Sequence, residues 1–418
     1  MSRLTRWKEP LKTALIVLLA ASALLLALRT GLFSELYRRG GDVQETPIPG
    51  GESLSIQPAA WPRVAAVTSA AGLRHGVAYD GAALAALYEG FSAYLGEALG
   101  SAQGPLLVSD KTWRQALNSQ SLYLDYDCAP GLDVLAAWLG TEADWGADYR
   151  ARRLLLAGGD DGSAVLYFMD DDGRAWQLQT EASWAAVRLK LEGYLPNGAE
   201  FAYHYPKLKD CAPYSLILAE LPVAATLRAS GRQDAAAAAL AARFGVSLSG
   251  TNSYPEADGT VVYLGDQGNL RLEPGGAVRY TAGEGQGLPA GTQAAARIEL
   301  GRGLLDALCA VCGGEAQLLY QGLRQEGERE LVLFDYMVGG IPVSVEGGCA
   351  AWAAFQNGLL TELWLLPRAY TANGAAEHLF PNLQAAAAAG SRRKGSQAAL
   401  VYQDVGDGTL TPFWAVED

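Results

Sequence analysis

Residues 259–282 read GTVVYLGDQGNLRLEPGGAVRYTA and contain three short apolar runs separated by turn residues. The breaks, Gln267-Gly268-Asn269 and Pro274-Gly275-Gly276, favour tight turns because glycine tolerates positive φ. Turns this short join only antiparallel strands, since a parallel pair requires a long crossover connection. The stretch therefore predicts an antiparallel meander.

The same pattern recurs along the chain, in alternation with helical patterns. Strand pairs are predicted around the MDDDG turn at 169–173 and around Gly339-Gly340, and further strands in LLTELWLLPRAY and LVYQDVGDGTLTPFWAV. Apolar residues at helical spacing predict helices over 80–100, 234–245, 292–314 and 375–390. Helices followed by meanders predict an α+β fold of two or three modules, each an antiparallel sheet covered by helices on one face.

The longest apolar run is WKEPLKTALIVLLAASALLLALRTG at 7–31, which has no charged residue between Lys12 and Arg29. Its core is short for a membrane span of about 20 residues and also fits a signal peptide. The residues after the core lack the small side chains at alternate positions that signal cleavage requires. We therefore expect an uncleaved transmembrane anchor over 13–33; a cleaved signal is the alternative.

The anchor sets the expected location and domain order. The basic excess is nearly the same on the two flanks of the anchor, but only a short stub precedes it and a long body follows it. We therefore expect a single-pass membrane protein with residues 1–12 in the cytoplasm and the body extracytoplasmic. A linker rich in Gly, Pro, Ser and Thr follows. The predicted parts are a cytoplasmic stub at 1–12, the anchor at 13–33, the linker at 34–62, an N-terminal α+β domain at 63–230, a middle helix and meander at 231–289, and a C-terminal α+β domain at 290–418.

The charge balance excludes one class of partner. The first 41 residues hold 7 basic and 2 acidic side chains, whereas the whole chain holds 32 Lys and Arg against 45 Asp and Glu. The acidic excess therefore lies in the body, which phosphate backbones and anionic headgroups repel. We expect no nucleic-acid binding.

One face of the predicted anchor is a candidate contact surface. Ala20, Ala23, Ala27 and Thr30 follow one another at helical spacing, and small side chains allow two helices to pack closely in lipid. We interpret these four residues as the transmembrane partner-binding face. The alternative is that an alanine-rich protein shows such a stripe by chance.

Five cysteines, at 128, 211, 309, 312 and 349, leave at least one thiol unpaired. Cys309 and Cys312 form CAVC, the spacing of a redox pair or half a metal site. LLDALCAVCGG places this pair on the last turn of a helix that ends at Gly313, whereas a thioredoxin-type pair opens a helix. We therefore interpret the cysteines as buried structural thiols, with metal or redox chemistry as the alternative.

The other candidate sites each have a structural interpretation. His75, His204 and His378 are isolated from one another, whereas metal sites gather several ligands. The MDDDG stretch is typical of a hairpin turn and lacks the spaced ligands of a calcium loop. Five aromatic residues are predicted to be core rather than a sugar groove: Trp113, Tyr123, Tyr126, Trp138 and Trp145. We expect no cofactor, no metal and no catalytic residue.

Four stretches together resemble the YycH and YycI regulatory proteins of Gram-positive bacteria. They are WKEPLKTALIVLL, VSDKTWRQALNSQSLYLDYDCAPGLDVLAAWLG at 108–140, the stretch at 254–282, and LVYQDVGDGTLTPFWAV. The resemblance implies PepSY-like modules and a membrane-anchored extracytoplasmic protein that adjusts an essential cell-wall sensor histidine kinase. It implies two partners, the kinase and a related YycH/YycI-type protein, and brings no catalytic residue.

Two hypotheses about function remain. The first is a non-catalytic regulator that modulates a two-component sensor histidine kinase through transmembrane and ectodomain contacts. The second is a cell-wall-associated ligand-binding protein, or an enzyme acting on the wall or on thiols. Convergent acid, base or nucleophilic groups would favour the second, and no such motif is found in the sequence.

Overall fold

The computed structural model describes residues 60–417 except 144, 146–148, 221–223, 347 and 377–378. The chain divides into two compact units, Met1–Leu54 and Ser55–Asp418, and the first lies outside the described residues. The predicted stub and anchor lie there too. Among the helices that the structure describes, none is long and apolar enough to span a membrane.

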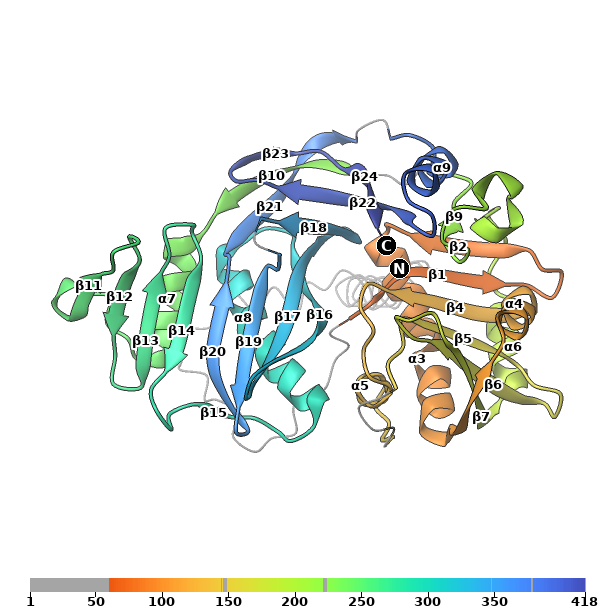
Figure 1. The fold of residues 1–418 in the computed structure, drawn as a ribbon, viewed down its shortest axis with the longest axis horizontal. Coiled ribbons are helices and arrows are strands. Elements are labelled where there is room, and N and C mark those ends of the chain that lie inside the picture. The colour runs from red at the N-terminus through yellow and green to blue at the C-terminus, as the bar shows by residue number, and fades with distance from the viewer. Residues whose placement is uncertain are drawn as a thin grey trace, which may run out of the picture. The chain divides into compact units, whose positions relative to one another are not determined.

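A seven-stranded antiparallel sheet forms the N-terminal part of the described unit (Figure 1). Its order is β2-β1-β4-β5-β6-β7-β3, so β2 and β3 are the edge strands. The strands are β1 (Pro62–Thr68), β2 (Arg74–Ala78), β3 (Gln103–Val108), β4 (Ser121–Tyr126), β5 (Arg153–Gly158), β6 (Ser163–Met169) and β7 (Ala175–Ser183). Asp170 and Gly173 form the turn between β6 and β7, which confirms the hairpin predicted at MDDDG.

Helix α3 (Gly81–Ser101) shows why the sequence forms this part of the fold. Asp80 caps it, because the carboxylate accepts the N–H of Ala83 at 3.0 Å. Its apolar residues recur at helical spacing, and Leu84, Phe91 and Leu99 are buried against the sheet. The predicted helix over 80–100 is confirmed.

The prediction that helices cover one face of each sheet is wrong for this sheet. Helices α3, α5 (Leu132–Trp138) and α6 (Trp184–Leu191) pack on one face, and α4 (Asp110–Asn118) packs on the other. The physical reason is visible in β4, whose six residues are all buried. Successive side chains of a strand point to opposite faces, so both faces of β4 must be covered.

A returning segment completes the second face. It contains β8 (Glu200–Phe201), two 3-10 helices, η1 (Ala202–His204) and η2 (Pro206–Leu208), and β9 (Leu216–Ile217). Phe201 and Leu216 pack there with Trp113 and Tyr123. This segment contacts the edge strand β2 so closely that a Cβ on Gly76 would lie 2.4 Å from the Ala199 Cβ.

A second, twelve-stranded sheet forms most of the remainder (Figure 1). Its order is β11-β12-β13-β14-β20-β19-β17-β18-β22-β24, with β15 on β20 and β16 on β17. The strands are β11 (Ser253–Pro255), β12 (Val261–Leu264), β13 (Gly268–Leu272), β14 (Val278–Ala282), β15 (Leu288–Pro289), β16 (Gln317–Glu326), β17 (Arg329–Val338), β18 (Ile341–Val345), β19 (Ala351–Gln356), β20 (Leu359–Leu365), β22 (Gln397–Asp404) and β24 (Phe413–Glu417). The meander predicted at 259–282 is confirmed as β12, β13 and β14.

Two helices cover one face of this sheet, α7 (Gln233–Phe244) and α8 (Ala294–Cys312) (Figure 1). Helix α7 ends at Gly245, which adopts a left-handed conformation with φ of 63°. A short helix η3 (Gly250–Asn252) follows α7. A separate three-stranded sheet, in the order β21-β10-β23, contains β10 (Ala225–Gly231), β21 (Arg368–Ala376) and β23 (Gly408–Leu410).

Two details differ from the sequence predictions. Strands β18 and β22 pair in parallel, because the chain between them is long enough to make a crossover. Helix α9 (Asn382–Arg392) begins after Pro381, whereas a helix over 375–390 was predicted. Proline disfavours helical conformation in the residue before it, and Ala376 instead pairs with β10.

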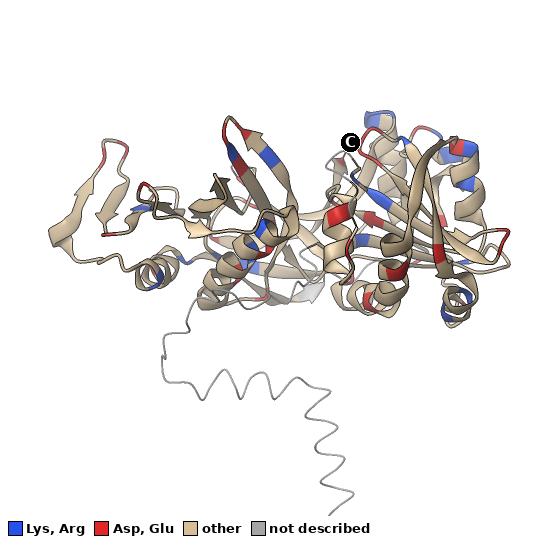
Figure 2. Ribbon diagram, turned by 90° about the horizontal axis from the view of Figure 1, so that it is seen from below, with Lys and Arg blue, Asp and Glu red and all other residues tan. Residues whose placement is uncertain are grey.

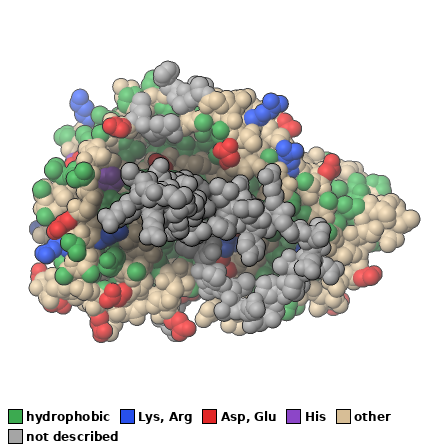
Figure 3. All heavy atoms as spheres, turned by 180° about the vertical axis from the view of Figure 1, so that it is seen from behind, with side chains coloured by type: hydrophobic (Ala, Val, Ile, Leu, Met, Phe, Trp, Pro, Cys, Tyr) green, Lys and Arg blue, Asp and Glu red, His purple; other side chains and the backbone are tan. Residues whose placement is uncertain are grey.

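The predicted domain boundaries at 230 and 289 remain predictions about folding units. The described residues belong to one compact unit in which strands pair across both positions. Strand β10 pairs with β21, and β14 pairs with β20. Acidic and basic residues are interspersed over this unit (Figure 2, Figure 3), in agreement with the many Arg–carboxylate pairs.

Candidate functional site

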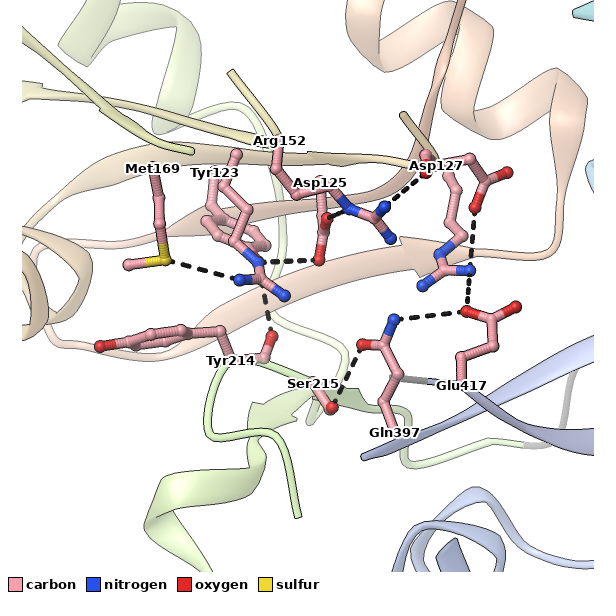
Figure 4. Close-up of polar contacts among 11 residues, drawn as sticks. Tyr123, Asp125, Asp127, Arg152, Met169, Tyr214, Ser215, Gln397 and Glu417 are labelled. Carbon is pink, nitrogen blue, oxygen red and sulfur yellow. Dashed lines mark hydrogen bonds and ion pairs between the residues drawn. The ribbon is translucent and has the colours of Figure 1, made fainter. Parts of the chain in front are cut away.

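The four anchor residues predicted to bind a partner, Ala20, Ala23, Ala27 and Thr30, lie outside the described residues. Within the described unit, the most unusual arrangement is a set of buried charges where the seven-stranded sheet meets β22 and β24. We call Arg63, Asp125, Asp127, Arg152, Arg153 and Glu417 the junction cluster (Figure 4).

Arg63 on β1 connects the two sheets. Its Nη1 lies 2.8 Å from Asp127 Oδ1 and 2.6 Å from Glu417 Oε2 of β24. Gln397 Nε2 on β22 also donates to Glu417, at 3.4 Å (Figure 4). Arg63 is only 4% exposed, so these contacts form in a largely dehydrated environment, where charge pairs interact strongly.

Asp125 is the second centre of the cluster. Its carboxylate accepts from Arg152 Nε at 3.3 Å and from Arg153 Nε at 3.1 Å. Arg152 also donates to the backbone carbonyl of Asp127 (Figure 4). The Tyr123 hydroxyl donates to Asp125 at 3.2 Å. The two arginines follow one another in sequence and both reach the same buried carboxylate.

The proton affinities follow from burial and charge pairing. Burial alone would lower the pKa of Arg63, but Asp127 and Glu417 more than offset it and the pKa is raised. Burial would raise the pKa of Asp125, but Arg153 and Arg152 outweigh it and the pKa is lowered. Burial prevails for Asp127, whose pKa is raised. Asp127 therefore binds a proton more readily than an ordinary aspartate does, whereas Asp125 binds one less readily.

A cavity of about 330 Å³ lies beside the cluster, lined by Asp127, Arg152, Asp335 and Glu417 among others. Burial raises the pKa of Asp335 to about 6, although the carboxylate accepts the N–H of Ala350 at 3.0 Å. Asp335 lies on β17, so the C-terminal sheet places a readily protonated carboxyl beside the cluster.

Close packing completes the junction. The N–H of Gly81 donates to the carbonyl of Gly339 in the β17–β18 turn at 3.1 Å. A Cβ on Gly340 would lie 2.5 Å from the Gly81 nitrogen, so the two backbones touch. The Trp138 and Tyr320 rings meet edge to face with centroids 5.7 Å apart. The two sheets are therefore joined by apolar contact as well as by charge.

The structure places the cysteines as free thiols. Cys128, Cys211 and Cys312 are buried, and Cys309 and Cys349 are half-buried. The CAVC pair lies on the last turn of α8 before Gly313, as predicted. Burial raises the pKa of Cys309 to about 12 and that of Cys312 to about 11. Both are therefore protonated near neutral pH, and a thiol is a far weaker nucleophile than a thiolate.

The histidines are not brought together. His75 Nδ1 lies 2.7 Å from the Leu195 carbonyl, and His204 Nδ1 lies 2.9 Å from Glu200. Burial lowers the pKa of His204, with Arg74 and Arg114 adding to the effect. His378 lies outside the described residues. Among the described residues, no three His, Cys, Asp or Glu side chains form a group that could hold a metal ion.

The prediction that the aromatic residues are core is confirmed for Trp113, Tyr123, Tyr126 and Trp138, which are buried, and Trp145 is half-buried. The sequence interpretation missed another pair. Trp352 and Trp364 stack on β19 and β20 with centroids 6.3 Å apart, and the Arg279 guanidinium lies 5.5 Å from the Trp352 ring centroid.

The sequence interpretation also missed the junction cluster, although a signal was present. Asp125 lies within the apolar strand SLYLDY, and Arg153 opens the apolar strand RLLLAG. A charge inside a strand that is otherwise apolar indicates a buried ion pair, because an unpaired buried charge is costly.

Comparison with known proteins gives one informative result. No protein-family model and no curated protein matches the sequence. Among solved structures, YycH from Bacillus subtilis matches with a TM-score of 0.52 and 12% sequence identity, covering 86% of this chain and 97% of that chain. The chain has the YycH fold. The match confirms the predicted resemblance at the level of fold.

The likeness to YycH concerns the fold that carries the junction cluster. At 12% identity the likeness concerns the arrangement of elements and not individual side chains. The junction cluster is therefore described from this chain alone. Chemically, its carboxylates are neutralised by guanidinium groups, so the arrangement is suited to fixing one sheet against the other.

Proposed function

We propose that this protein is a non-catalytic, membrane-anchored regulator that modulates a two-component sensor histidine kinase through transmembrane and ectodomain contacts. The observation that carries the proposal is the YycH fold over 86% of the chain. The sequence pattern supports it, since an apolar segment precedes an acidic body and four stretches resemble the YycH and YycI regulators. A related YycH/YycI-type protein is the expected second partner.

The geometry of the junction supports a mechanical role. Arg63 joins β1 to β24, and the Gly81–Gly340 contact joins α3 to the β17–β18 turn. A partner that binds either sheet therefore contacts a unit whose two sheets are joined. The alternative of thiol chemistry gains no support, because burial keeps Cys309 and Cys312 protonated near neutral pH.

The experiment that tests this proposal uses the anchor. Changing Ala23 and Ala27 to Leu should weaken association with the kinase, because bulky side chains separate helices that small residues allow to pack. Changing Leu18 and Leu25 to Ala is the matched control and should matter less. Both variants are brought to equal membrane levels, and kinase-dependent reporter output and crosslinking in native membranes are measured. Equal reporter output and equal crosslinking of the two variants would mean that the helix only anchors the protein and makes no specific contact with the kinase.

A further inference from the structure

Strand β2 is an edge of the seven-stranded sheet, and its outer side is only partly covered. The segment before β8 runs beside its first half. The N–H of Asn197 donates to the carbonyl of Arg74 at 2.9 Å, and His75 lies against the Leu195 carbonyl. This covering is an ordinary way to protect an edge strand from unwanted pairing.

The side chain of Asn197 completes the covering, because it makes the hydrogen bonds that the backbone of a neighbouring strand would make. Its Oδ1 accepts the N–H of Gly76 at 2.9 Å, and its Nδ2 donates to the carbonyl of the same residue at 2.8 Å. A residue in a neighbouring antiparallel strand would make the same pair of bonds. The outer edge of β2 is therefore aligned for strand pairing at Gly76.

Beyond Asn197 the edge faces a cleft of about 640 Å³. In an antiparallel ladder, the peptide groups of alternate residues point to the same side, so those of Ala78 point outward as those of Gly76 do. Ala78 lines the cleft, together with Val77 and Leu218. The last part of β2, where Ala78 is 7% exposed, thus places a donor and an acceptor at the wall of this cleft.

The charges around the cleft favour a basic occupant. Asp80 and Glu220 both line it. Asp80 Oδ1 accepts the hydrogen bond that caps α3, which leaves Oδ2 available to an occupant of the cleft. The Glu220 side chain is exposed. Gly339 of the β17–β18 turn also lines it, so an occupant would touch both halves of the junction.

We infer that this cleft binds an extended, basic segment of a partner protein, which adds to the sheet as a strand beside β2. Main-chain hydrogen bonds to Ala78 supply affinity, and a cationic side chain between Asp80 and Glu220 supplies selectivity. The inference rests on the proposed function in one respect: the partner is the regulated kinase's extracytoplasmic chain. The other edge strand, β3, is less suited because Pro105 lacks an N–H and Gly104 has a φ of +56°.

The test uses the purified full chain in detergent at about 0.15 M salt, where long-range charge effects are screened. The probe is a fluorescein-labelled, capped peptide of about eight alternating valine and lysine residues, a typical strand length. Binding is followed by fluorescence anisotropy. The same peptide N-methylated at alternate residues has the same charge but lacks the donors on one edge, and should bind about tenfold more weakly.

Two variants test whether the peptide binds in this cleft. Ala78→Pro removes the outward N–H without removing a bond to β1 and should weaken binding roughly fivefold or more. Glu220→Arg reverses one charge of the cleft and should weaken binding about tenfold. The control, Glu192→Arg, makes the same charge change at an exposed ion pair with Arg188 and should leave binding unchanged.

Equal binding of the plain and N-methylated peptides, or of the Glu220→Arg and Glu192→Arg proteins, would overturn the inference. The Glu220→Arg variant keeps the test valid if Ala78→Pro does not fold. The peptide assay contains no kinase, so it reports on the cleft alone. Equal kinase association of the two anchor variants, with peptide binding retained, would count against the transmembrane contact of the proposed function instead.

Discussion

Replacement of Arg63 by Met is the perturbation that tests the junction most sharply. The substitution removes the guanidinium that lies 2.8 Å from Asp127 and 2.6 Å from Glu417, and it leaves two carboxylates facing each other. Removing one partner of a buried ion pair typically costs about 3 to 5 kcal/mol. Glu417 is 32% exposed and can rehydrate, so we expect the lower end, about 3 kcal/mol.

The assay is urea unfolding of Ser55–Asp418, the compact unit, followed by tryptophan fluorescence at pH 7. The triple variant Arg63→Met, Asp127→Asn, Glu417→Gln removes all three charges and should return to within about 1 to 2 kcal/mol of the parent. Arg174→Met is the matched control. Arg174 also pairs with two carboxylates, but it is 59% exposed, so the change should cost less than about 1 kcal/mol. A cost for Arg63→Met no larger than that of Arg174→Met would refute the reasoning.

Three further predictions follow from single features. Because the folded pKa of Asp335 is about 6, above the ordinary 3.8, its carboxylate destabilises the fold above pH 6, and the penalty disappears as the pH falls below 3.8. Asp335→Asn should therefore exceed the parent in stability by about 1 to 3 kcal/mol at pH 7.5 but not at pH 3.5, as melting curves would show; a gap independent of pH contradicts this. Gly340→Ala should cost about 1 to 3 kcal/mol more than Gly339→Ala in urea titrations, because both have positive φ but only a Cβ on Gly340 would collide with another backbone; equal costs would contradict that close contact. Cys309 and Cys312 should react with iodoacetamide at pH 8 far more slowly in the folded protein than in urea, and equal rates would contradict the raised pKa values of the two thiols.

The local parts of the fold could be predicted from the sequence because their causes are local. The turn residues in 259–282 fix the meander, and the Asp80 cap with the apolar spacing after it fixes α3. The end of α8 at Gly313 was predicted for the same kind of reason. In each case the residues that decide the structure are neighbours in the chain.

What the sequence could not provide was long-range pairing. Arg63 and Glu417 are separated by 354 positions, and no local pattern joins them. The second covering layer of the seven-stranded sheet depends on the return of the segment from Glu200 to Ile217, which periodicity does not predict. The parallel pairing of β18 with β22 likewise depends on where a long connection ends.

We propose that the chain regulates a sensor histidine kinase without catalysing a reaction. The most direct test reconstitutes the kinase into proteoliposomes with and without the full-length chain and measures the rate of kinase autophosphorylation. Flotation of the vesicles confirms that both proteins are inserted. We predict that the rate changes as the chain is added and levels off near equal amounts of the two proteins. An autophosphorylation rate that stays the same with the chain fully inserted would contradict the account.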